Sequence, residues 1–283
     1  MSAVAVKELV PRVGRFLFGR RAFARFARFL WMRSRSDVSN DFETNGERAF
    51  QQTVVRVLFG DEHVVVFDVG ANVGIWSAPL VQDFFDADKL GRLSLHLFEP
   101  SPDSFASLQD GMERFRDGHV VLNQCAVGKH TDKRFLYVMG CKAGTNTLRP
   151  GDSDDVNDVI EVDCTNLDAY CRTRGIKKID FMKIDVEGGD LEVLLGAEGL
   201  LRQRAVRFVQ FEYNHRWVFS RAFLRDVFEL VGPYGYSVGK LTPTGVERYH
   251  EWHPELESFR EGNYLIWRDE LPGPQSNGSW WQK

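Results

Sequence analysis

From about Phe50 onward, short apolar runs alternate with segments of helical periodicity. β-branched runs predict strands at 64–69, 93–98, 119–126, 179–185, 205–212, 236–241 and 263–267. A period near 3.6 predicts helices at 47–59, 73–86, 102–115, 167–174, 189–202 and 219–231. Because strands and helices alternate, we expect an α/β fold: a doubly wound, mostly parallel sheet of seven strands with an antiparallel edge.

Two segments depart from this alternation. Residues 134–139 and 159–164 predict a small β insertion around the acidic loop 151–158. The spacing of acids in that loop does not fit a calcium-binding loop. The expected organisation is a helical arm over 1–45, one domain over 46–271 and a loose, Pro/Gly/Ser-rich tail over 272–283.

Residues 9–36 interleave arginine with aromatic side chains. Plotted as one continuous helix, Phe18, Phe26 and Phe29 fall outside the apolar sector, which holds Val13, Phe16, Phe23, Ala27, Leu30 and Trp31. A peripheral helix on anionic lipid is one interpretation, and a transit peptide is another. A helix packed on the main domain is the interpretation that we favour.

Charge is distributed unevenly along the chain. Residues 1–36 contain eight Arg, and Lys7 cancels Glu8, so this segment carries +8. Because the whole chain carries −4, residues 37–283 carry −12. Such an acidic body is not typical of a nucleic-acid-binding protein. No 18-residue stretch lacks charge, and the four cysteines have no metal-binding spacing, which favours a reduced, cytoplasmic protein.

The segment FDVGANVG at 67–74 is typical of a buried strand that turns through glycines into a helix. Asp68 ends the strand, and Gly70 and Gly74 permit positive φ and a close approach to a ligand. Asn72 is expected to cap the following helix. A carboxylate, free N–H groups and a helix N-terminus around one site suit a small ligand with an amine and a carboxylate.

The same turn lacks the features of two common nucleotide sites. It has no G-x-G of a nicotinamide fingerprint and no Gly-Lys-Ser/Thr of a phosphate loop. The next apolar run, 93–98, is followed by Glu99, and an acid at this position commonly binds ribose hydroxyls. Asp68 and Glu99, without phosphate-binding elements, indicate S-adenosylmethionine as the cofactor.

Three further segments carry a specific pattern: FEPSPDSFASL at 98–108, LNQCAVG at 122–128 and IDFMKIDVEGGDLEVLLGAEGLL at 179–201. Together with FDVGANVG, and in this order, they resemble the FkbM family of S-adenosylmethionine-dependent methyltransferases. The resemblance extends from about Phe50 to about Trp267. Asp190 is the one departure, because the family usually has Glu there.

This resemblance implies a Rossmann-like, class I methyltransferase fold and roles for individual residues. Because the stretch matching 144–148 lies near the cofactor mouth in the family, Asn146 and Thr147 are expected to contact the substrate. Members of the family methylate hydroxyls of natural products and glycan sugars. The expected cofactor-binding residues are Asp68, Gly70, Asn72, Gly74, Glu99, Ser101, Ala126 and Asp185.

Transfer of a methyl group to a hydroxyl needs a base or a metal ion, because a protonated hydroxyl is a poor nucleophile. Acidic residues and a histidine follow the strands 179–185 and 205–212, whose carboxyl ends should lie beside the cofactor. The expected catalytic residues are Asp185, Glu187, Glu212 and His215.

Two mechanisms fit these residues. In the one that we favour, a carboxylate or His215 is the general base, its pKa set by neighbouring acids. In the other, Asp185, Glu212 and Asn214 hold Mg²⁺ as a Lewis acid. Asp185 could alternatively only orient the cofactor's amine, and His215 could stack on Trp217.

The sequence thus predicts an O-methyltransferase that acts on a hydroxyl of a sugar, glycan or natural product, in the cytoplasm or peripherally at a membrane. The alternatives are a non-catalytic cofactor-binding module recruited to membranes by the basic arm, and an N-methyltransferase. The presence of Asp68, Glu99 and Asp185 favours an enzyme over the binding module. The sequence carries no signal for the oligomeric state.

Overall fold

The computed structural model describes residues 3–35, 37, 41–115, 119–139, 145–151, 155–268, 270–276 and 281. The chain forms two compact units, Met1–Ser39 and Asn40–Lys283. Residues 40–45 therefore belong to the larger unit and not to the arm. Gly144, part of the acidic loop (152–154) and most of the end of the tail (277–280, 282–283) lie outside the described residues.

The smaller unit consists of helix α1 (Ala3–Ser34), which is interrupted at Gly19. Gly19 has φ 74° and ψ 157°, a conformation that no α-helix contains. The two segments on either side of Gly19 therefore point their side chains independently. The single helical plot over 9–36 was wrong for this reason.

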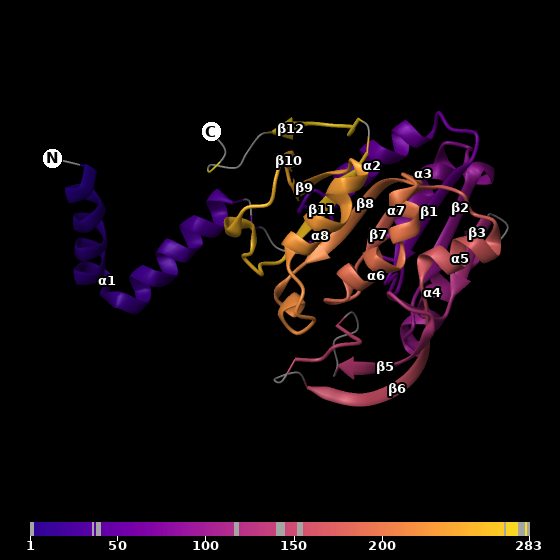
Figure 1. The fold of residues 1–283 in the computed structure, drawn as a ribbon, viewed down its shortest axis with the longest axis horizontal. Helices are drawn as coiled ribbons and strands as arrows, with labels where there is room; N and C mark the ends of the chain where they lie inside the picture. Colours follow the sequence, from indigo (N-terminus) through magenta and orange to yellow (C-terminus); the bar gives the residue numbers. More distant parts are fainter. Residues whose placement is uncertain are drawn as a thin grey trace. The chain divides into compact units, whose positions relative to one another are not determined.

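In the described part of the larger unit, nine strands form one sheet in the order β12-β10-β9-β11-β8-β7-β1-β2-β3 (Figure 1). Strands β3, β2, β1, β7 and β8 run parallel, while β11 is antiparallel to both β8 and β9. The strands are β1 (Val64–Val69), β2 (Leu93–Phe98), β3 (His119–Asn123), β7 (Ile179–Ile184), β8 (Val206–Tyr213), β9 (Ser237–Thr242), β10 (Gly245–Tyr249), β11 (Gly262–Trp267) and β12 (Gln275–Ser276).

This arrangement confirms the predicted doubly wound, mostly parallel sheet with an antiparallel edge. Each of the seven predicted strands contributes at least in part to this sheet, but the count of seven was wrong because β10 and β12 extend the edge. In β10 only Val246 and Tyr249 are buried, so its apolar signal is weak. β12 has two residues, too few for a recognisable pattern. In the same C-terminal segment, Trp281 stacks on His253 with ring centroids 5.1 Å apart.

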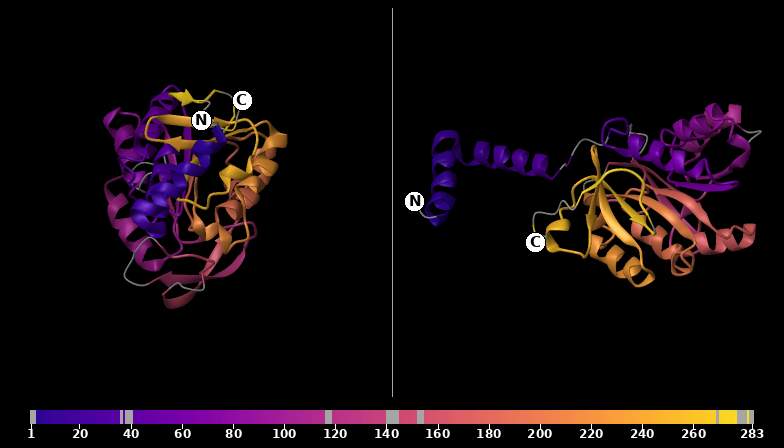
Figure 2. Two further views of the ribbon diagram at one scale, coloured as in Figure 1. Left: turned by 90° about the vertical axis from the view of Figure 1, so that its left-hand side faces the viewer. Right: turned by 90° about the horizontal axis from the view of Figure 1, so that it is seen from above.

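Helices cover both faces of the sheet (Figure 2). One face packs α2 (Glu47–Leu58), α3 (Ser77–Asp86) and α4 (Pro102–Met112) against alternate strand residues such as Val64 and Val66. The other packs α5 (Leu167–Arg174), α6 (Asp190–Gly196), α7 (Glu198–Arg202) and α8 (Leu224–Val231) against residues such as Phe67 and Val69. Two apolar cores thus hold the strand ends in place.

A second, three-stranded sheet forms the predicted insertion. Its order is β4-β6-β5, with β4 (Ala126–Val127), β5 (Asp132–Met139) and β6 (Val156–Thr165). β5 and β6 pair antiparallel along most of their length. The strand predicted at 119–126 is therefore divided between the two sheets, which brings the insertion to the carboxyl end of the main sheet.

Candidate active site

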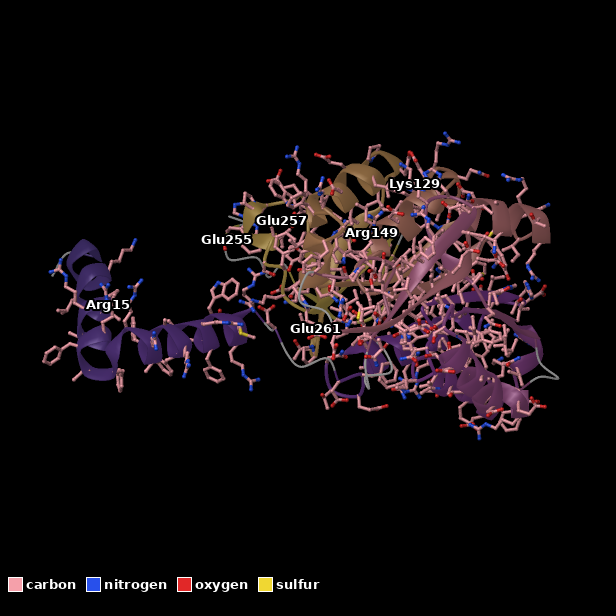
Figure 3. All side chains as sticks on the ribbon, turned by 90° about the horizontal axis from the view of Figure 1, so that it is seen from below. Arg15, Lys129, Arg149, Glu255, Glu257 and Glu261 are labelled. Atoms are coloured by element: carbon pink, nitrogen blue, oxygen red, sulfur yellow. The ribbon has the colours of Figure 1, made fainter. Side chains whose placement is uncertain are left out.

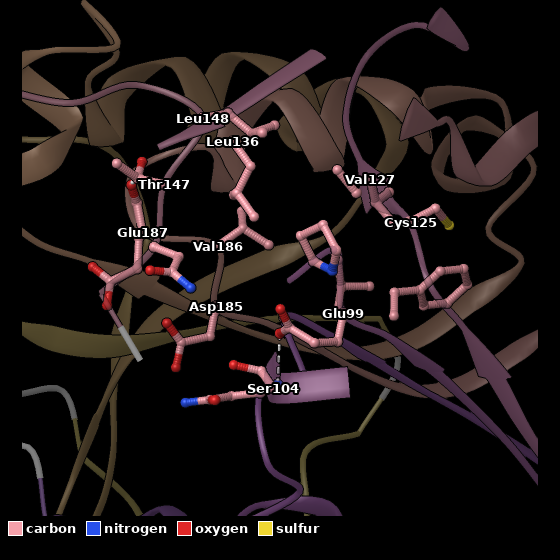
Figure 4. Close-up of a pocket in the computed structure, with 17 residues that line it drawn as sticks. Glu99, Ser104, Cys125, Val127, Leu136, Thr147, Leu148, Asp185, Val186 and Glu187 are labelled. Carbon is pink, nitrogen blue, oxygen red and sulfur yellow. Dashed lines mark hydrogen bonds between the residues drawn. The ribbon is translucent and has the colours of Figure 1, made fainter. Parts of the chain in front are cut away.

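A cleft opens at the carboxyl ends of β1, β2 and β7 (Figure 4). The strand order changes direction between β1 and β7, and ligands of open α/β sheets bind at such points. About 670 Å³ of empty space, including open solvent, lies in the cleft, within the range of small-molecule sites. Its lining includes Val69, Gly70, Asn72, Phe98, Glu99, Ser104, Cys125, Ala126, Val127, Leu136, Asn146, Thr147, Leu148, Asp185, Val186 and Glu187.

The floor of the cleft is the turn after β1. Gly70 has φ 87°, and the backbone N–H groups of Gly70 and Ala71 both donate to the carbonyl oxygen of Phe98. A Cβ at Gly70 would lie 1.9 Å from the carbonyl oxygen of Asp185. Only glycine therefore fits where the ends of β1 and β7 approach each other.

Glu99 is fixed at one end of the cleft and is almost buried. Its Oε2 accepts from the backbone N–H of Asn72 at 2.9 Å, and its Oε1 accepts from that of Ser101 at 2.8 Å. Burial raises the pKa of Glu99 to about 7, although these two N–H donors lower it. Each oxygen keeps lone-pair capacity toward the cleft.

These residues fit the ribose end of the expected cofactor. A carboxylate with two remaining acceptor sites matches a pair of adjacent hydroxyls. Asn72, which also lines the cleft, has a buried Oδ1 without a hydrogen-bond partner among the described residues. An unpartnered buried acceptor is costly unless a ligand donates to it.

Three residues expected to bind the cofactor do not line the cleft. Asp68 faces the opposite side of the sheet, where it accepts from Ser77 Oγ at 2.6 Å, and burial raises its pKa to about 6. Gly74 packs against α4, since a Cβ there would lie 2.9 Å from Met112. Ser101 contributes its N–H to Glu99. Asp68, Gly74 and Ser101 therefore lie behind the lining residues and stabilise them.

The expectation that Asn72 caps a helix was also wrong. Helix α3 begins at Ser77, four residues later than predicted, and Trp76 is its N-cap. Asn72 and Gly74 have φ of 49° and 89°, values that no right-handed helix allows. The Asn72 N–H is therefore directed to Glu99 instead of into a helix.

Three carboxylates gather at the other end of the cleft. Oxygen atoms of Asp185, Glu187 and Glu212 all lie within 4.8 Å of one another. Asp185 and Glu187 line the cleft, and Figure 4 shows Asp185 between Glu187 and Glu99 in its view, whereas Glu212 is buried. The structure thus brings three of the four expected catalytic residues together.

Each of these carboxylates has a donor from the protein. Lys183 Nζ lies 2.7 Å from Asp185 Oδ2, and Arg216 Nε lies 3.1 Å from Glu187 Oε2. Asn214 Nδ2 donates to Glu212 Oε2 at 2.6 Å. Two cations and one amide therefore hold the three acids in place.

Burial raises the pKa of Glu187 and Glu212 despite those donors. Burial, with the negative charge of Asp185, raises the pKa of Glu187 to about 7, and the positive charge of Arg216 acts in the opposite direction. Burial, with the charges of Asp185 and Glu187, also holds the pKa of Glu212 well above its usual range. Glu187 can therefore take up or release a proton near neutral pH.

His215 does not occupy the expected position. His215 is exposed at the start of a short 3-10 turn and belongs neither to the lining nor to the carboxylate group. Its stacking on Trp217 was wrong as well, because Trp217 is buried against Phe211. Asn214 lies beside Glu212, to which its Nδ2 donates, and its Oδ1 accepts from the Arg216 N–H. Glu187 joins Asp185 and Glu212 as a carboxylate that could bind an ion.

The insertion forms the opposite wall. Asn146 and Thr147 line the cleft as expected, and Thr147 Oγ1 donates to the carbonyl oxygen of Glu187 at 2.8 Å. Asn146 Oδ1 accepts from the backbone N–H of Met139. The insertion is thereby fastened to the loop that carries the acids.

Sequence reasoning missed several residues of this site. Leu136 of β5 and Ser104 of α4 line the cleft, and Arg216 pairs with Glu187. The signal for Leu136 was its alternation with the exposed Phe135 in the predicted insertion. Arg216 carries no comparable signal, because only the fold brings it beside Glu187.

Comparisons with known proteins place this site in context. A family model described as the methyltransferase FkbM domain matches residues 68–238. The chain is 30% identical over 179 residues to 31-O-demethyl-FK506 methyltransferase FkbM of Streptomyces tacrolimicus, covering 54% of this chain and 65% of that protein. It is 26% identical over 157 residues to Methyltransferase 1 of Beauveria bassiana (strain ARSEF 2860), covering 50% and 60%.

The chain thus spans less than two thirds of the length of either curated relative. Among solved structures, it is similar to methyltransferase FkbM of Methylobacillus flagellatus KT, with a TM-score of 0.46 and 17% identity. That similarity covers 73% of this chain and 44% of the other.

Proposed function

This chain belongs to the FkbM methyltransferase family, and we propose that it transfers the methyl group of S-adenosylmethionine to a hydroxyl of a sugar, glycan or natural-product acceptor. The family match supports the cofactor, which when bound supplies a methyl group on a sulfonium. The relative from Streptomyces tacrolimicus is named for methylating 31-O-demethyl-FK506, which supports an oxygen acceptor.

One observation carries the proposal: a single cleft holds an anchored acid at one end and a group of carboxylates that includes Glu187 at the other. Glu99 is suited to the cofactor's ribose, and Asp185 and Glu187 line the far end. The acceptor must lie between the cofactor and a base. The positions of Glu99 at one end of the cleft and of Asp185 and Glu187 at the other are consistent with this arrangement.

We assign the general base to Glu187. It lines the cleft, and burial raises its pKa to about 7, near the value at which a base is most useful at neutral pH. Arg216 holds Oε2 and leaves Oε1 for the proton of the acceptor hydroxyl. The backbone of Glu187 has φ 54°, so the chain turns sharply at this residue.

Asp185 and Glu212 have supporting roles in this proposal. Asp185, paired with Lys183, lies beside the base and keeps the proton affinity of Glu187 high. Glu212 is buried beside both acids and acts as a positioning residue. His215 has no role, because it is exposed and outside the cleft.

Mg²⁺ on Asp185, Glu187 and Glu212 is the alternative to a general base. Hard cations prefer such oxygen ligands, and the 4.8 Å limit on their separations allows a common ion. We favour the base because Lys183, Arg216 and Asn214 already donate to these carboxylates. A bound cation would compete with the two positive side chains.

The acceptor would contact the insertion. Thr147 and Asn146 offer polar groups on this wall, while Leu136 and Leu148 offer apolar surface. A mixed wall of this kind suits an alcohol on a larger, partly apolar or sugar-like scaffold.

Screening the purified protein with methyl-labelled S-adenosylmethionine tests the proposal. The acceptors are free sugars, oligosaccharides and macrolide alcohols, with matched amines as the comparison. We expect a methyl ether from at least one alcohol. Labelled amines without labelled ethers would indicate an N-methyltransferase, and cofactor binding without transfer would indicate a binding module.

A further inference from the structure

The break at Gly19 gives the second half of α1 faces of its own. Figure 3 draws these side chains, with Arg15 marking the segment before the break. We call residues 20–34 the arm helix. Its fifteen residues contain five Arg and no acid. Which side chains share a face of the arm helix is therefore judged from Arg20 onward, without the residues that precede the break.

Three of the five arginines lie opposite the apolar side chains of the arm helix, and Arg20 and Arg33 flank the apolar side chains at its two ends. Arg21, Arg25 and Arg28 are spaced i, i+4 and i+7, so they share one face, which we call the basic face. The apolar face, spaced i, i+3, i+4 and i+7 and rotated by about half a turn, consists of Phe23, Phe26, Ala27 and Leu30. Phe26 joins this face because Val13 and Phe16, which precede the break at Gly19, no longer help to define the apolar sector.

Within its own unit, the apolar face is largely exposed. Phe26 and Leu30 keep 55% and 51% of their surface exposed. Phe23 is half-buried, because its ring lies on Gly14, where a Cβ would clash with it. Phe29 and Trp31, at the two edges of the face, are 53% and 37% exposed. So much exposed aromatic surface on one short helix is typical of an interaction site.

Charge determines which partner fits this helix. All three arginines of the basic face are exposed. A nucleic-acid duplex would neutralise the arginines and leave the aromatic rings in water. A bilayer surface satisfies both faces, since anionic headgroups attract arginine while the acyl boundary takes up aromatic and aliphatic side chains. Among the described residues, no helix is long and apolar enough to cross a membrane, so the helix would lie along the surface.

We infer that the arm helix binds the surface of an anionic lipid bilayer, with the apolar face in the acyl boundary and the basic face among the headgroups. The arginine stems extend along the helix and carry their charges up to the headgroup level. This inference is independent of the proposed chemistry, because the arm helix contains none of the residues that line the cleft.

Sedimentation of the full-length protein with vesicles tests the inference. The vesicles contain phosphatidylcholine alone or with one third phosphatidylglycerol. We expect binding to the anionic vesicles only, weakened at least about tenfold when salt rises from about 0.1 M to about 1 M. Equal binding to both vesicle types, or no binding to either, would overturn the inference.

Two arm variants separate charge from insertion. R25E/R28E should weaken binding at least about tenfold by reversing charge. F26S/L30S keeps every charge and should weaken binding by a similar factor of about ten, because it removes the inserted side chains. The controls, R172E/R202E and F135S, change exposed residues of the larger unit and should keep binding within about twofold.

The same variants distinguish the inference from the competing interpretations of the arm helix. If F26S/L30S binds like the wild type, contact with lipid is electrostatic adhesion only and the inference fails. If it lowers the melting temperature instead, the apolar face packs on protein and the inference also fails. Binding of duplex DNA that depends on Arg25 and Arg28, without vesicle binding, would assign the arm to nucleic acid.

Discussion

The backbone N–H of Asn72 donates a 2.9 Å hydrogen bond to Oε2 of Glu99. The bond joins the turn after β1 to the end of β2, so one carboxylate is fixed by two strands. Asn72 can donate in this direction only because its φ is positive and α3 starts later, at Ser77. Backbone N–H groups of the protein itself therefore hold the acid at the cofactor end of the cleft.

Replacing Glu99 should weaken cofactor binding. Glu99→Gln keeps the shape and removes a charged acceptor, which is worth about 1.5–3 kcal/mol when it pairs with hydroxyls. We expect the Kd for S-adenosylhomocysteine to rise roughly tenfold to a hundredfold by calorimetry. The control Asp103→Asn changes an exposed acid on α4. Equal Kd values for Glu99→Gln and the wild type would remove Glu99 from the binding site.

Cofactor binding should also depend on pH through the same residue. Burial raises the pKa of Glu99 to about 7, so its carboxylate is protonated below that pH and loses acceptor capacity. Binding of S-adenosylhomocysteine should therefore tighten as pH rises through about 7 and level off about one unit higher. Titrations at several pH values check this. If Glu99→Gln shows the same pH dependence as the wild type, another group is responsible.

Lys183 should matter for stability more than an exposed lysine does. It is buried and pairs with Asp185 at 2.7 Å. Burial lowers the pKa of Lys183, but the charges of Asp185, Glu47 and Asp68 together hold it above its usual value. Lys183→Met leaves these acids uncompensated and should cost about 3–5 kcal/mol of unfolding free energy at neutral pH.

Lys178→Met provides the control, because Lys178 pairs with Asp180 at 3.1 Å but is half exposed. Such a pair contributes about 1 kcal/mol or less. Denaturant unfolding compares the two variants. The Lys183→Met defect should shrink toward about pH 5, where Asp68, with its pKa raised to about 6, becomes neutral. Equal losses in both variants would show that the buried pair is not special.

Chelation distinguishes the two mechanisms at the carboxylate group. With a general base, EDTA should leave the rate of methyl transfer unchanged within about twofold. With Mg²⁺ on Asp185, Glu187 and Glu212, EDTA should abolish activity and added Mg²⁺ should restore it. The second result would replace the base by a metal ion while leaving the site in place.

The apolar pattern predicted the strands that build the cleft, since β1 and β2 begin and end at the expected residues. Buried parallel strands are continuous apolar runs and are easy to recognise. The start of α3 was missed because positive φ at Asn72 cannot be read from helical periodicity. The edge strand β10 was missed because it has few apolar residues.

The site was predictable where residues follow a strand directly. Glu99 and Asp185 each come immediately after a buried strand, so their placement follows from the strand end. Asp68 and His215 do not lie where we expected, because of small backbone details. Asp68 is still within β1 and faces the other side of the sheet, and His215 lies beyond the capped turn at Asn214. The pairing of Arg216 with Glu187 joins two separate loops, and no local pattern records it.

The pH dependence of the methyl-transfer rate, measured for the wild type and Glu187→Gln on one alcohol acceptor, tests the central claim most directly. Burial raises the pKa of Glu187 to about 7, so the wild-type kcat should rise with pH up to about 7 and then level off. Glu187→Gln should lower kcat by about a hundredfold or more and remove this rise, while Glu198→Gln, at an exposed acid on α7, serves as the control. A Glu187→Gln variant with the wild-type rate and the wild-type pH profile would contradict the account.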